Sequence, residues 1–72
     1  MERRYQDDEY KGHLIRVYAE LVEGGGAWSI VVRVQKPDGD WFPDIVERDH
    51  TYEILDVAFA TGDEKGRQLI DA

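Results

Sequence analysis

The chain has 72 residues, which is the size of a single domain. It contains no cysteine and only two histidines, so disulfides are excluded and a structural zinc site is not expected. No apolar run approaches the about 20 residues that span a bilayer, and the charged start lacks the apolar stretch of a signal peptide. These features predict a cytoplasmic protein that does not bind membranes.

The formal net charge is −7, with nine basic residues among sixteen acidic ones. Proteins that neutralise phosphates carry clustered lysine and arginine, and here the basic residues are scattered. The charge pattern therefore predicts that the chain does not bind nucleic acid.

Residues 1–9 are rich in charge, and we expect them to be a flexible N-terminus outside a single domain at 10–72. Residues 10–22 then alternate between apolar and more polar side chains, which is typical of a half-buried strand. The residues predicted to face the core are Ile15, Val17, Ala19 and Leu21.

A second strand is predicted at 27–36, after a turn rich in glycine at 23–26. Its β-branched content favours a central position in the sheet. With the turn centred on Gly24 and Gly25, every inward cross-strand pair is apolar, so the turn and the pattern agree on one buried face. These pairs are Leu21 with Trp28, Ala19 with Ile30, Val17 with Val32, and Ile15 with Val34.

A third strand is predicted from about Trp41 to Arg48, at the sheet edge because Pro43 cannot donate to a ladder. Two turns at 36–40 are compatible with the sequence. A type I turn with a glycine bulge, which Pro37 before Asp-Gly favours, puts Phe42 and Val46 inside and Trp41 and Ile45 outside. A two-residue Asp38–Gly39 turn reverses this and pairs Arg33 with Asp44. Either register turns one carboxylate inward, Asp44 or Glu47.

From about Thr51, a plausible N-cap, apolar and small residues recur with the spacing of one helical face. Asp63 and Arg67 are four residues apart in the favourable order for a helical ion pair. Gly62 weakens a helix interior, so the segment is either one helix that packs closely on the sheet through its glycines or two short helices. The unbroken apolar stripe favours one helix.

The predicted fold is α+β: a three-stranded antiparallel β-meander with one C-terminal helix packed on one face. This leaves the other sheet face uncovered, with aromatic and β-branched residues among arginines, a composition typical of interface centres. The predicted interface residues are Tyr18, Val31, Arg33, Trp41 and Ile45. We expect the partner to be a protein or a second copy of the chain, with a homodimer the simplest form.

No residue pattern predicts catalysis, a cofactor or a metal site, so the chain is not expected to be an enzyme. The single serine, Ser29, lies in a predicted strand without a nucleophile motif. His50 beside Asp49 is explained more simply as part of the polar entry to a helix than as a metal or acid–base site. The segment Asp38-Gly39-Asp40 is typical of a turn and lacks the further oxygen ligands of a calcium loop.

Several segments resemble a family of short uncharacterised bacterial proteins with a β-β-β-α layout. They are Tyr10-Lys11-Gly12-His13-Leu14-Ile15, Trp28 with the alternating valines, Pro37-Asp38-Gly39 and the ending Gly66 to Asp71. The family is one of unknown function, so the resemblance implies a fold and assigns no functional residues. A fainter similarity is to antitoxin domains of the same shape.

Two functions of different kinds follow as hypotheses. The leading one is a small interaction domain that self-associates or docks a protein through its open sheet face. The alternative is an antitoxin-like or inhibitor protein whose acidic surface binds a basic target site.

Overall fold

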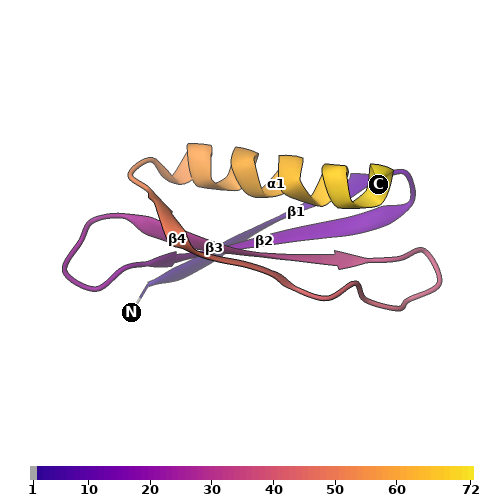
Figure 1. The fold of residues 1–72 in the computed structure, drawn as a ribbon, viewed down its shortest axis with the longest axis horizontal. Coiled ribbons are helices and arrows are strands. Elements are labelled where there is room, and N and C mark those ends of the chain that lie inside the picture. The colour runs from indigo at the N-terminus through magenta and orange to yellow at the C-terminus, as the bar shows by residue number, and fades with distance from the viewer. Residues whose placement is uncertain (1) are drawn as a thin grey trace.

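The computed structural model describes residues 2–72 as one antiparallel sheet with a single helix on one face (Figure 1). The sheet has the order β1-β2-β3-β4, a meander in which each strand pairs with the next. The elements are β1 (Arg3–Tyr10), β2 (His13–Leu21), β3 (Trp28–Gln35), β4 (Ile45–Tyr52) and α1 (Leu55–Asp71). The predicted α+β class, antiparallel sheet and C-terminal helix are confirmed.

The prediction of three strands was wrong, because residues 3–10 form a further strand instead of lying outside the domain. This strand pairs with β2 along its whole length, from Arg3 opposite Glu20 to Tyr10 opposite His13. None of its side chains is fully buried. Backbone hydrogen bonding needs no apolar pattern, so the sequence of this edge strand carries no alternation from which it could be recognised.

The predicted pairing of the next two strands is confirmed in every inward pair, from Ile15 opposite Val34 to Leu21 opposite Trp28. Because β-strand side chains alternate between faces, this register gathers the apolar residues on the side that α1 covers. The fully buried hydrophobic residues come from β2, β3 and α1, and the helix also buries its two glycines. The hydrophobic ones are Ile15, Val17, Ala19, Ile30, Val32, Val34 and Ala58.

The helix is continuous through Gly62, as the apolar stripe predicts, and its glycines face β2. A Cβ placed on Gly62 would lie 2.5 Å from a methyl carbon of Val17, and one on Gly66 would lie 2.7 Å from a methyl carbon of Ile15. Real Cβ atoms do not approach other carbons so closely, so both positions need glycine for the helix to pack at this distance.

The helix begins later than predicted, and Thr51 is not its N-cap. The strand β4 runs through Thr51 to Tyr52, and Ile54 occupies the N-cap position without a side-chain hydrogen bond. Tyr52 fitted the helical stripe because it lies three residues before Leu55. It points toward the core from the end of a strand instead.

Neither predicted register holds over the whole third hairpin. The turn is the bulged one: the Gly39 amide donates to the Lys36 carbonyl at 2.9 Å, and Gly39 has a φ of 98°. Phe42 accordingly packs against the core. The faces then switch across Pro43 and Asp44, so that Ile45 is inside opposite Val32 and Val46 is outside opposite Val31.

The helix seat gives a direct test. Alanine is about 1 kcal/mol better than glycine in a helix interior. Gly62→Ala should nevertheless destabilise the protein, by a net of about 1–3 kcal/mol, because the stiff side chain of Val17 cannot move away from the added methyl group. Urea denaturation measures this change. Gln68→Ala, at an exposed position of the same helix, is the control and should be near neutral. A Gly62→Ala midpoint equal to or above that of the wild type would contradict the close seat.

Candidate functional site

One face of the sheet lies against α1, and within residues 2–72 no other element covers the opposite face (Figure 1). We call this uncovered side the open face. The register places on it every second residue of each strand, out of phase with the core residues. It therefore carries most of the predicted interface, together with a contribution from β1 that the sequence did not indicate.

An unbroken row of aromatic and aliphatic side chains crosses the open face. Tyr5 is opposite Tyr18, Tyr18 is opposite Val31, and Val31 is opposite Val46, so the row includes one residue from each strand. We call Tyr5, Tyr18, Val31 and Val46 the apolar row. Its ends are the most exposed, with 60% of Tyr5 and 50% of Val46 accessible to solvent. Such a continuous strip is unlike the scattered single apolar residues of an ordinary surface.

A row of charges runs beside the apolar row, two residues along each strand. It consists of Asp7, Arg16, Arg33 and Asp44. The Arg16 guanidinium donates to both carboxylate oxygens of Asp7, at 2.6 and 2.7 Å, and this contact holds the pKa of Asp7 below its ordinary value. Arg33 donates to Asp44 at 3.3 Å. The two arginines are cross-strand neighbours, and each is neutralised by an aspartate on its outer side.

Three arginines of the open face also lie over aromatic rings. The guanidinium of Arg3 is 4.0 Å from the ring centre of Tyr18, and that of Arg16 is 4.6 Å from the ring centre of Tyr5. Arg33 lies 4.5 Å from the ring centre of Trp41. The neighbouring Arg16 lowers the pKa of the Tyr18 hydroxyl. Because cation–π contacts restrict flexible arginine side chains, they hold this face in a defined arrangement.

Four of the five predicted interface residues lie on the open face: Tyr18, Val31, Arg33 and Trp41. Ile45 does not, because the change of face at Pro43 turns it toward Val32 and the core. Val46 takes its place, as the alternative register had it. Tyr5 was missed, since a lone tyrosine in a charged segment does not indicate a strand.

Because β1 supplies one end of the apolar row, the contacts that hold β1 are part of the site. Arg67 of α1 donates to Asp8 at 2.8 Å and to Asp63 at 2.9 Å, so one guanidinium joins the strand to the helix. The Asp63–Arg67 pair is the one predicted from sequence. At the end of β1, Asp71 accepts hydrogen bonds from the Tyr10 hydroxyl at 2.7 Å and from the Lys11 ammonium at 2.6 Å.

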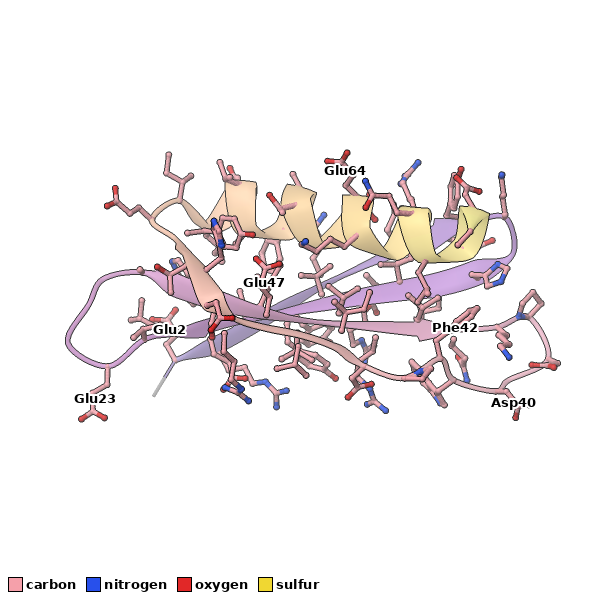
Figure 2. The ribbon with its side chains drawn as sticks, viewed as in Figure 1. Glu2, Glu23, Asp40, Phe42, Glu47 and Glu64 are labelled. Atoms are coloured by element: carbon pink, nitrogen blue, oxygen red, sulfur yellow. The ribbon has the colours of Figure 1, made fainter. Side chains whose placement is uncertain are left out.

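The carboxylate that turns inward from β4 is Glu47, and it lies between the strand and the helix (Figure 2). It accepts a hydrogen bond from the Tyr52 hydroxyl and pairs with Lys65 at 2.9 Å. These partners lower the pKa of Glu47, while burial and Glu47 itself raise the pKa of Tyr52 to about 12. The predicted cost of an inward carboxylate is thus offset by a hydroxyl and an ammonium on the same side.

The described residues offer little for chemistry. Within residues 2–72, no three histidine, aspartate or glutamate side chains are grouped so that they would hold a metal ion. Ser29 lies in β3 opposite Glu20, and His50 lies near Tyr52, with 6.5 Å between the ring centres. The helix of the described chain is too polar and too short to cross a bilayer.

Comparisons with protein-family models, with curated proteins and with solved structures find no match for this chain. The resemblance to short bacterial β-β-β-α proteins therefore stays a prediction, and no functional residue is carried over from a relative.

The contacts of β1 predict a specific pH dependence. One carboxylate oxygen of Asp63 is buried without a hydrogen-bond partner, and both burial and the nearby Asp8 raise the pKa of Asp63. Folding therefore favours protonated Asp63, and this favourable contribution is lost as the pH rises through the raised pKa. Asp63→Asn keeps an oxygen for Arg67 and supplies an amide donor toward Asp8. It should stabilise the protein by about 1 kcal/mol at neutral pH.

This advantage should narrow near pH 4 and below, where wild-type Asp63 is itself protonated. Urea midpoints of both proteins across this pH range measure the effect. The matched control is Asp56→Asn, an exposed residue in the first turn of the same helix, where the loss of charge should cost a few tenths of a kcal/mol. A destabilised Asp63→Asn variant at neutral pH would show that the Arg67 ion pair outweighs the unpartnered oxygen.

Proposed function

We propose that this chain is a small protein-interaction domain that self-associates through the open face of its sheet. The observation that carries the proposal is the apolar row, which crosses all four strands from Tyr5 to Val46. The row lies among arginines that are already ordered by aromatic rings and carboxylates. Aromatic and arginine side chains are the residue types that contribute most at protein interfaces.

The charge distribution supports a second copy as the partner. Alternation along the strands places four arginines and four carboxylates on the open face, so this face is close to neutral, while the whole chain carries −7. Two copies repel one another strongly through their other surfaces and only weakly through this one. The charged residues counted are Arg3, Arg16, Arg33, Arg48, Asp7, Glu9, Glu20 and Asp44.

The size of the face sets the expected strength of the association. Four strands about 4.8 Å apart and about eight residues long cover roughly 500 Å² in projection, and side-chain relief makes the accessible area larger. Stable interfaces bury about 800 Å² per partner. The open face therefore lies near the lower end of the size range of specific interfaces, and we expect a dissociation constant in the micromolar range.

The inhibitor hypothesis has weaker support from the geometry. Several carboxylates on the helix side of the molecule are already paired with the chain's own cations: Asp8 and Asp63 share Arg67, Glu47 pairs with Lys65, and Asp71 pairs with Lys11. An acidic surface that binds a basic site gains most when its carboxylates are free.

The test is Val31→Glu, which places a carboxylate at the centre of the apolar row. Sedimentation equilibrium should show a monomer–dimer equilibrium for the wild type and a monomer for this variant, because the dimer would bury two unpaired charges. Val57→Glu is the matched control. Val57 is a valine of the helix with 47% of its surface exposed, and its substitution should leave the dimer intact.

Far-UV circular dichroism checks that both variants remain folded. A wild type that stays monomeric up to about 1 mM would contradict the proposal, since the 4 kcal/mol that this limit represents is less than a specific interface provides. Loss of the dimer in Val57→Glu but not in Val31→Glu would move the interface to the helix.

A further inference from the structure

We infer that the two copies meet face to face about a two-fold axis that runs along the apolar row, across the strands. This inference rests on the proposed self-association and adds to it the arrangement and the residues that determine it. Sheets that pack face to face keep their strands roughly aligned, which leaves two in-plane two-fold axes, one across the strands and one along them. The charges beside the apolar row distinguish between these two axes.

With the axis across the strands, each residue of the apolar row faces the same residue of the second copy. Residues on one side of the row in one copy face the residues on the opposite side of the row in the second copy. On β1 this brings Arg3 opposite Asp7 of the second copy, because the two lie equally far from Tyr5. On β2 it brings Arg16 opposite Glu20 of the second copy, on either side of Tyr18. Each of these contacts occurs twice, so the arrangement creates four pairs of opposite charge.

With the axis along the strands, between β2 and β3, each strand of one half faces a strand of the other half. Arg16 then lies opposite Arg33 of the second copy, and Asp7 lies opposite Asp44. All four of the resulting contacts are between like charges. Because like charges at a desolvated interface are strongly unfavourable, this arrangement is disfavoured.

The pairs across the interface do not require the contacts within each chain to break. Arg16 uses Nε and one terminal nitrogen for Asp7, and a guanidinium has five N–H donors, so donors remain for Glu20 of the second copy. Packed sheets lie about 10 Å apart, a gap that an arginine and a glutamate side chain span together. Arg3 is held over Tyr18, beside the axis, before the second copy arrives.

A charge exchange tests the axis. In a homodimer of the Glu20→Arg variant, the new arginine of one copy faces Arg16 of the other copy. In a homodimer of the Arg16→Glu variant, the new glutamate of one copy faces Glu20 of the other copy. Each variant should therefore dimerise at least about tenfold more weakly than the wild type. An equimolar mixture should recover a heterodimer of wild-type affinity, because both contacts are again between opposite charges.

The axis along the strands predicts a different result. Arg16→Glu would then face Arg33 and would strengthen its own homodimer, which would overturn the inference. Wild-type dimerisation without recovery in the mixture would also overturn it, while leaving the proposed self-association in place. A wild type that does not dimerise would contradict the proposed function itself.

A second measurement covers the case in which Arg16→Glu loosens β1 by removing its pair with Asp7. The chain has no cysteine, so Tyr5→Cys introduces a single thiol at the end of the apolar row. With the axis across the strands, the two thiols face each other, and a short bismaleimide should link them. With the axis along the strands, residue 5 faces Val46 of the second copy, and the linker should fail. Val57→Cys, on the helix, is the control and should not be linked.

Discussion

The structure depends on how closely α1 packs on β2. Gly62 and Gly66 leave no space for a side chain above Val17 and Ile15, so the helix backbone lies directly on β2. The side chains buried between the helix and the central strands form the hydrophobic core of this chain of 72 residues, because β1 and β4 contribute no fully buried side chain. A single helix covers one sheet face only. The open face follows from this arrangement.

The same contact explains which parts of the fold could be predicted from sequence. The pairing of β2 with β3 and the glycines of the helix were predictable because each inward position is apolar or small, and only one register satisfies all of them. For β1 no such constraint exists. Its side chains on the helix side are Arg4, Gln6, Asp8 and Tyr10. Of these, Asp8 and Tyr10 are held by an ion pair and a hydrogen bond to residues about 60 positions away. Polar contacts at that separation leave no periodicity in the sequence.

The candidate site was predictable to the same extent. Tyr18, Val31 and Arg33 lie on β2 and β3, where the register was fixed by the core, and their position on the open face followed from alternation. The hairpin before β4 was not predictable in this way, because Pro43 and Asp44 lie outside regular pairing and let the chain change faces. As a result, Val46 lies on the open face and Ile45 faces the core, the reverse of the favoured prediction. Tyr5 could be placed only once β1 was known to be a strand.

The arrangement of charge on the open face bears on specificity more than on affinity. An exposed apolar row on a small acidic protein would associate with any apolar surface if it stood alone. The row of Asp7, Arg16, Arg33 and Asp44 restricts this, because its signs read minus, plus, plus, minus across the sheet. That order is symmetric about the middle of the sheet, so rotation about an axis along the strands sets like charges against each other. Rotation about the apolar row instead places this charged row opposite the residues on the other side of the apolar row, which on β1 and β2 are Arg3 and Glu20. Asp7 then faces Arg3, and Arg16 faces Glu20, so both contacts are between opposite charges. Two adjacent rows of side chains therefore suffice to favour one symmetric arrangement of the face and to oppose the other.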